Sequence, residues 1–210
     1  MQPTPAGNAP SPAPFNPGAY PVQAEVNAPP TIDRWRVLQY FLAIPQIIVL
    51  YILIFAMEIA AVVAWFSILF TGEESEGIWS FRAGVLRWQW RVVTYALFLH
   101  DKYPPFELAS GETDPATEPA LFAISRPQGE RNRMTCALRL IWVIPAAFVA
   151  GFIAIALYVV AIIAWFVVLF TGEWPEGMRK FAIGALRWLM RVTAYEFLLV
   201  DEYPPFAMEP

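Results

Sequence analysis

The sequence contains very few of the residues on which most active sites depend. It has one cysteine, Cys136, and one histidine, His100, in 210 residues. A single cysteine excludes an intramolecular disulfide and a cysteine-based metal cluster, and a single histidine excludes a metal site built from several imidazoles. Since no motif for a cofactor or a metal stands out elsewhere, we expect a protein that is not an enzyme.

Charged residues are also scarce, at 15% of the chain against about 25% in a typical soluble domain. Hydrophobic residues make up 58% of the chain. A soluble fold of this size would have to bury an unusual amount of apolar surface, whereas a lipid bilayer removes that requirement. The net charge of −4 gives no indication of nucleic-acid binding. We therefore expect an all-α membrane protein whose first partner is membrane lipid.

The chain is a tandem repeat with an offset of 100 residues. Between positions 64 and 106, more than half of the residues are identical to the residue found 100 positions later, without a gap. Such a match indicates two copies of one structural unit. Earlier in the unit the match weakens, although Ile44-Pro45 recurs as Ile144-Pro145. We expect membrane repeats at residues 34–106 and 134–210, joined by a polar linker at 107–133.

Residues 1–33 form a proline-rich segment before the first unit. Nine prolines and no lysine or arginine occur in the first 30 positions. The segment lacks the basic and apolar stretches of a signal peptide, and it has too little apolar surface to fold by itself. We expect a disordered tail. It serves either to keep the chain soluble or, as an extended polyproline helix, to bind a proline-recognising partner.

Each unit begins with an apolar run, at residues 36–70 and 137–170, that exceeds the roughly 20 residues of a simple membrane span. Proline breaks or kinks a helix. Pro45 and Pro145 therefore divide each run into a short interfacial helix and a spanning helix, at 36–44 and 46–70 in the first unit. Each spanning helix is expected to end at a Thr-Gly pair, Thr71-Gly72 or Thr171-Gly172.

A second apolar segment follows in each unit, at residues 79–100 and 179–200, and carries a pair of arginines at matching positions, Arg87 and Arg91 or Arg187 and Arg191. Arg87 and Arg91 are one helical turn apart and share a narrow polar sector, while the rest of the helix is apolar. That pattern favours a buried bundle helix over one on the membrane surface. Two spans per unit also keep matching loops on one side. We therefore expect two hairpins with four transmembrane helices. The termini and linker share the face richer in Lys and Arg, which indicates the cytoplasmic side of the cell membrane.

Arginine inside a bilayer requires a polar partner or a wet cavity. At about 1.5 Å of rise per residue, Glu58 lies at the depth of Arg91 across the first hairpin, whereas the second unit has Tyr158 in place of Glu58. Three interpretations are open: contacts that hold the helices together, a path for an anion or a lipid headgroup, and side chains that reach the interface. The candidate polar seam comprises Glu58, Arg87, Arg91, Arg187 and Arg191.

Each unit closes with the motif Asp-x-Tyr-Pro-Pro-Phe. The double proline ends a helix, and Tyr and Phe rings suit the boundary between membrane and water. We expect interfacial anchors here, with a docking site for a partner as the alternative. The anchor residues are Tyr103, Pro104, Pro105, Phe106, Tyr203, Pro204, Pro205 and Phe206.

These motifs together resemble a family of unknown function, DUF4389. Its pattern is present here as Leu42-Ala43-Ile44-Pro45, Ile68-Leu69-Phe70-Thr71-Gly72, Gly84-Val85-Leu86-Arg87-Trp88 with Arg91-Val92 and Tyr95, and Asp101 to Phe106, and the second copy runs from Val143-Ile144-Pro145 to Phe206. The resemblance covers residues 36–206 and implies a membrane fold without a known activity. The family's basic Thr-Gly-Arg turn is acidic here, at Glu73 and Glu173.

The sequence therefore predicts a non-catalytic structural or accessory subunit of the membrane, in contact with a larger complex or with a second copy. The alternative is a small transporter or lipid-handling protein that uses the polar seam.

Overall fold

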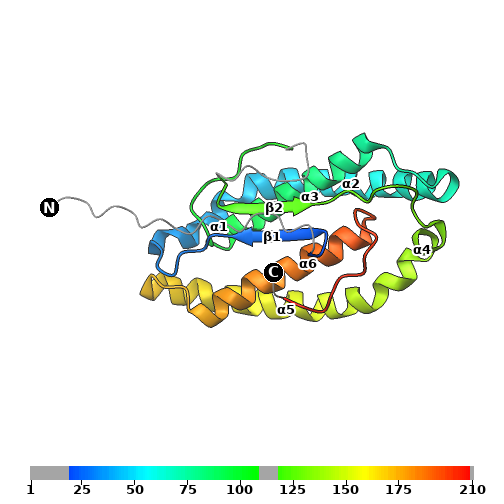
Figure 1. The fold of residues 1–210 in the computed structure, drawn as a ribbon. Coiled ribbons are helices and arrows are strands. Elements are labelled where there is room, and N and C mark those ends of the chain that lie inside the picture. Colours follow the sequence, from blue (N-terminus) through cyan, green and yellow to red (C-terminus); the bar gives the residue numbers. More distant parts are fainter. Residues whose placement is uncertain (1–18, 109–117, 209–210) are drawn as a thin grey trace.

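A computed structural model of the chain describes residues 19–108 and 118–208. It contains two helical hairpins and a small β-sheet (Figure 1). The first hairpin pairs α2 (Ile44–Thr71) with α3 (Glu76–Ala96), and the second pairs α5 (Arg139–Thr171) with α6 (Glu176–Glu196). The expected pair of helical hairpins is thus present. Short helical segments precede each hairpin: η1 (Arg34–Leu38) and α1 (Gln39–Leu42) in the first unit, and α4 (Arg133–Ala137) in the second.

The long helices end where the Thr-Gly pairs predict. Gly72 and Gly172 adopt φ angles of +80° and +76°, and each donates its backbone N–H to the fourth residue before it, Ile68 or Val168. Glycine enters this left-handed region without steric cost, which makes it the usual residue just past a helix end.

The two prolines have different effects in the two units. Pro45 lies in the first turn of α2, where a missing N–H costs nothing. Pro145 lies inside α5, which continues through it from Arg139 to Thr171. The expected division of the second apolar run at Pro145 is therefore wrong. Packing of the surrounding turns on α6 keeps the helix continuous despite the lost hydrogen bond.

Two strands form in segments that we expected to be irregular. β1 (Val22–Val26) lies within the proline-rich tail and β2 (Ala120–Ile124) within the polar linker. They pair antiparallel, with Val22 opposite Ile124 and Val26 opposite Ala120. Their inward side chains join the main hydrophobic core, which explains why these short segments are ordered. The expected disorder is thus wrong for β1, while residues 1–18 lie outside the described part of the chain.

The elements form three layers. α2 packs on α3 and α5 packs on α6, while the sheet covers the opposite side of the inner helices, with β2 on α3 and β1 on α6. The inner helices are consequently buried on both sides, and from Trp79 onward α3 has no exposed residue. This burial accounts for the near absence of a polar face on α3 in the sequence.

The two units run in opposite directions. The backbone N–H of Ile32, before η1, donates to the carbonyl of Gly172 at 3.0 Å, and that of Arg131, before α4, donates to Gly72 at 2.9 Å. The start of each unit therefore meets the far end of the other unit's long helix, and α2 and α5 are antiparallel (Figure 1). Matching turns such as Thr71-Gly72 and Thr171-Gly172 lie at opposite ends. Two parallel hairpins would have placed these turns at the same end, so the antiparallel arrangement differs from the one that the sequence indicates.

Only two helices of the described residues, α2 and α5, are long and apolar enough to cross a membrane. Just 22% and 11% of the residues in their most apolar stretches are buried, so neither resembles the core helix of a soluble protein. α3 and α6 do not meet this condition, and four spanning helices are not seen. Large apolar side chains cover the outer face of both long helices: Ile48, Ile52, Phe55, Ile59, Val62, Phe66 and Phe70 on α2, and Phe148, Phe152, Ile155, Val159, Ile162, Phe166 and Phe170 on α5.

Candidate functional site

The arginines of the inner helices bind the backbone of the sheet. Arg187 donates from Nε to the carbonyl of Ala24 at 2.8 Å, and Arg191 donates to that of Val22 at 3.4 Å. Arg87 makes the matching contact in the first unit, to the carbonyl of Phe122 at 3.4 Å. Strand-to-strand bonds occur at Asn27 and Ser125, so the alternate carbonyls of Val22 and Ala24 point away from β2. The arginines thus satisfy acceptors on the open edges of the sheet.

The C-terminal segment covers the other side of the second arginine pair. Arg187 and Arg191 donate from Nη1 to the carbonyls of Met208 and Ala207, at 3.0 and 3.2 Å. Buried guanidinium groups need several acceptors, and backbone carbonyls supply them without a carboxylate. These contacts favour the interpretation of the arginines as structural, because they join a helix, a strand edge and the chain end.

Glu58 does not belong to this arrangement. It takes part in none of the ion pairs among residues 19–108 and 118–208, and it lines a cavity on α2 with Arg139 and Glu196. The expected pairing of Glu58 with Arg91 is therefore wrong, because Arg91 is buried on α3 while the Glu58 side chain is exposed. Sequence reasoning missed Arg139 and Glu196. A comparison of the two copies would have marked both, because the matching residues are the uncharged Gln39 and Ala96.

The Tyr-Pro-Pro-Phe segments fold back onto the inner helices. The rings of Tyr103 and Tyr203 pack edge to face on Tyr95 and Tyr195, with centroids 5.4 and 5.2 Å apart. Trp188 donates directly to the carbonyl of Pro205 at 2.7 Å. In the first unit Trp88 donates to Gln46, which in turn donates to Pro104. Pro104 and Pro204 are buried, whereas Phe106 and Phe206 remain exposed. Their placement at a membrane boundary stays a prediction.

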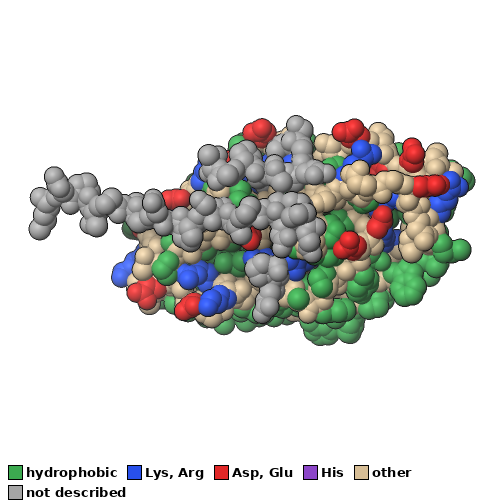
Figure 2. Space-filling view, viewed as in Figure 1, with side chains coloured by type: hydrophobic (Ala, Val, Ile, Leu, Met, Phe, Trp, Pro, Cys, Tyr) green, Lys and Arg blue, Asp and Glu red, His purple; other side chains and the backbone are tan. Residues whose placement is uncertain are grey.

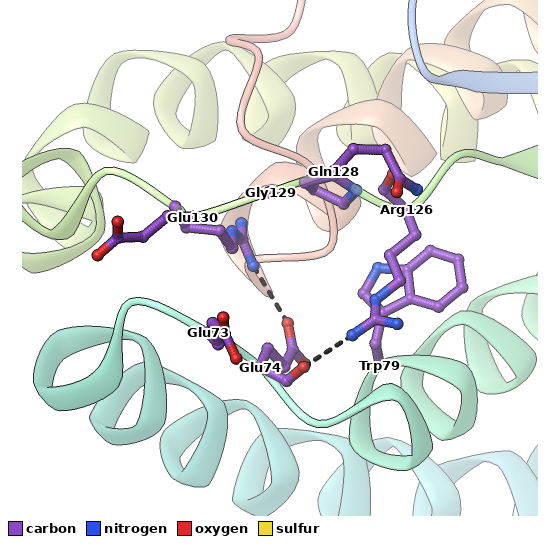
Figure 3. Close-up of a pocket in the computed structure, with 9 residues that line it drawn as sticks. Glu73, Glu74, Trp79, Arg126, Gln128, Gly129 and Glu130 are labelled. Carbon is purple, nitrogen blue, oxygen red and sulfur yellow. Dashed lines mark hydrogen bonds and ion pairs between the residues drawn. The ribbon is translucent and has the colours of Figure 1, made fainter.

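A polar cavity of about 250 Å³ lies where the two units meet (Figure 3). Glu74 forms ion pairs with Arg82 and with Arg131, the latter at 3.1 Å, and its backbone carbonyl accepts from Arg126 at 2.7 Å. Arg131 also binds Asp201, which accepts from Arg139 at 3.0 Å. These buried charges connect residues from the first unit, the linker and the end of the second unit.

The ion-pair network acts as a clamp between the units. The carboxylates of Glu74 and Asp201 bind the guanidinium groups of Arg82, Arg131 and Arg139. The residues that line the cavity include no hydroxyl, thiol or imidazole. In the described ranges, no group of three or more His, Cys, Asp or Glu side chains is placed to hold a metal ion. The matching positions at the other end carry Trp174 and Ala182, both buried, so apolar packing takes the place of the ion pair there.

Comparison with known proteins identifies the repeated unit. No curated protein and no solved structure matches the chain. A family of domains does match it, once over residues 36–107 and again over residues 133–208. The two stretches coincide with the two hairpins and their closing Tyr-Pro-Pro-Phe segments, and the chain therefore belongs to the family described as Domain of unknown function (DUF4389), of which it contains two copies.

Proposed function

We propose that the protein is a non-catalytic structural protein of the membrane, embedded in one leaflet through the outer face of α2 and α5. The observation that carries this proposal is the apolar surface of those helices, on which Phe55 is 64% and Phe148 68% exposed. An exposed surface of this extent requires lipid or protein to cover it. Figure 2 shows charged side chains at both ends of the molecule and hydrophobic ones along the edge over α5.

The sheet supports a helix layer that lies parallel to the membrane. If α2 and α5 crossed the bilayer, the strands beside α3 and α6 would lie at membrane depth, with Gln23 and Glu25 on the outer side. Polar and charged side chains are costly in the hydrocarbon region. A single helix layer is about 10 Å thick, and one leaflet offers about 15 Å of hydrocarbon. In this orientation no polar loop has to cross the bilayer. This supports a location of the protein in the cytoplasmic leaflet of the cell membrane.

A depth profile along α2 tests this orientation. Spin labels at Ile48, Phe55, Val62 and Phe70, in a Cys136→Ala background in liposomes, report the relative accessibility of oxygen and of a water-soluble nickel complex. We expect equal depth at all four positions and water accessibility at Gln23 on the sheet. A profile that is deepest near Phe55 and shallow at Ile48 and Phe70 would show a spanning helix and contradict the proposal.

An accessory role requires a partner on the aqueous side or a second copy. The exposed rings of the Tyr-Pro-Pro-Phe segments offer a surface for it. Purification in a mild detergent, with the mass of the particle measured by light scattering, tests this part. A stoichiometric complex or a homo-oligomer is the expected result, and a monomer that carries only lipid would contradict an accessory role.

A further inference from the structure

Two cavities lie along the seam between α2 and α5, on the side of the proposed membrane contact. The first, of about 340 Å³, is lined by Glu58, Trp65 and Phe66 of α2, by Arg139 at the start of α5, and by Glu196 and Phe197 at the end of α6. The second, of about 450 Å³, lies against the other half of α2 and the middle of α5.

The two cavities occupy equivalent positions in the repeat. Five residues that line the second cavity stand 100 positions from residues that line the first: Tyr40, Ala96, Leu97, Tyr158 and Ala161 match Leu140, Glu196, Phe197, Glu58 and Ala61. The charged residues of the first cavity have neutral residues at the equivalent positions. Glu58 and Glu196 correspond to Tyr158 and Ala96, and Arg139 corresponds to Gln39. The equivalent positions in the repeat are thus occupied by neutral residues, so the local helix packing does not require a charge at each of them.

Arg139 has hydrogen-bonding capacity left over. Its side chain is 2% exposed, and its Nε and Nη1 atoms have no hydrogen-bond partner. Only Nη2 is engaged, by Asp201 at 3.0 Å, while the guanidinium carbon lies 4.0 Å from the centre of the Tyr195 ring. A buried N–H without an acceptor destabilises the fold. Nε and Nη1 lie on different sides of the guanidinium group, so either one can donate a single hydrogen bond to an acceptor such as a phosphate oxygen.

The two carboxylates of the same cavity lack a cation. Neither Glu58 nor Glu196 forms an ion pair with any residue in the described ranges. Glu58 and Glu196 line the same cavity, and partial burial together with the nearby charge of Glu58 raises the pKa of the Glu196 carboxyl. A cation between them would relieve that repulsion. The remaining walls, from Ala61 to Leu198, are apolar.

We propose that this cavity binds the headgroup of a phospholipid that carries a primary ammonium group, such as phosphatidylethanolamine. The phosphodiester accepts a hydrogen bond from one of the free N–H groups of Arg139, the ammonium group donates to Glu58 and Glu196, and the acyl chains follow the apolar seam into the leaflet. The proposal rests on the membrane contact of α2 and α5 described above. Choline lacks the N–H donors that the two carboxylates require, so phosphatidylcholine binds more weakly.

The equivalent positions of the repeat supply the test variant. The triple substitution Glu58→Tyr, Arg139→Gln and Glu196→Ala replaces each charged residue by the neutral residue found 100 positions away. Native mass spectrometry of the delipidated full chain, in detergent with added phosphatidylethanolamine, phosphatidylcholine or phosphatidylglycerol, measures retention of each lipid. We expect the wild type to prefer phosphatidylethanolamine by about tenfold, and the triple variant to lose that preference. The control Tyr158→Leu, in the second cavity, should retain it.

Equal retention of the three lipids by the wild type, or an unchanged preference in the triple variant, would overturn the proposal. So would phosphoethanolamine without acyl chains competing as strongly as the intact lipid, because the site would then hold a soluble ligand. Glu58→Gln, which changes one charge at constant shape, covers the case in which the triple variant does not fold. Flotation of the wild type with liposomes tests the membrane contact separately. Failure there would contradict the proposed function and not the headgroup specificity alone.

Discussion

At the scale of single residues, His100 is the group whose titration the fold affects most clearly. The side chain is buried beside the ring of Tyr95, and its Nε2 atom lies 3.1 Å from the hydroxyl of Thr94. Burial lowers the pKa of His100 from 6.5 to about 4. The unfolded chain therefore binds a proton that the folded chain rejects between these pH values, and stability must fall as the pH decreases through this window.

We predict that the free energy of unfolding decreases by up to about 3 kcal/mol between pH 7 and pH 4 because of His100 alone. His100→Val should remove this contribution, since the matching Val200 is fully buried in the second unit. Thermal unfolding in detergent at pH 7 and pH 5 measures the effect. An equal loss of stability in the wild type and in His100→Val would contradict the assignment.

At the same scale, the sequence showed which arginines are inside the molecule but not what they bind. Arg187 and Arg191 contact backbone carbonyls, which every residue possesses, so no partner stands out in the sequence. The sequence predicts an ion pair of Glu58 with Arg91 because Glu58 is the available acid on the facing helix. The true neighbour, Arg139, lies at the start of the other long helix, and a hairpin considered by itself cannot place it.

At the scale of elements, the left-handed glycines set where α2 and α5 end. A Cβ atom on Gly172 would lie 3.3 Å from the carbonyl oxygen of Ile32, and one on Gly72 would lie 2.8 Å from the Glu130 side chain. Both positions have positive φ, at which an alanine costs roughly 1–2 kcal/mol before any contact is counted. The end of each long helix is thus fixed by backbone geometry and by a segment of the other unit.

We predict that Gly172→Ala lowers the free energy of unfolding by roughly 1–2 kcal/mol, while Gly151→Ala, in the middle of α5 with open space around it, leaves it unchanged or raises it. Chemical denaturation in mixed micelles, followed by tryptophan fluorescence, compares the two variants. Equal stability of Gly172→Ala and the wild type would argue against a strained helix end.

Helix positions were predictable from the sequence at this scale, and the strands were not. The apolar runs and Thr-Gly pairs define α2 and α5, and the segments around Arg87 and Arg187 define α3 and α6. The strand residues Val22–Val26 stand among prolines, and a strand of five residues depends on its partner, which lies about 100 residues later. The proline-rich composition of this segment indicates disorder, and it hides the short alternation of apolar and polar residues that is typical of a strand.

At the scale of the whole molecule, buried charges hold the two units together at one end. Glu74 of the first unit accepts from Arg82 of the same unit and from Arg131 before the second hairpin. We predict that Glu74→Gln, which leaves two buried guanidinium groups short of a carboxylate, lowers the free energy of unfolding by about 3 kcal/mol. The exposed neighbour provides the control, and Glu73→Gln should change stability by less than about 0.5 kcal/mol. Thermal denaturation of the two variants separates them, and equal effects would refute the clamp.

The orientation of the units was not available from the sequence. The sequence of a direct repeat is the same whether its copies lie parallel or antiparallel in space. The backbone hydrogen bonds from Ile32 to Gly172 and from Arg131 to Gly72 establish the antiparallel direction. Parallel hairpins of spanning helices would place matching loops at one end of the molecule, whereas the antiparallel hairpins place them at opposite ends.

The antiparallel pairing of two equivalent hairpins bears on how the protein was able to diversify. Two separate chains of one unit each, paired in the same way, would form a homodimer, and every mutation would then alter both halves at once. In a fused chain each half mutates alone. Around one of the two equivalent cavities the charged residues Glu58, Arg139 and Glu196 are present, while the equivalent positions Tyr158, Gln39 and Ala96 are neutral. Fusion thus allows one of two equivalent places in the fold to stay neutral while the other acquires charged groups.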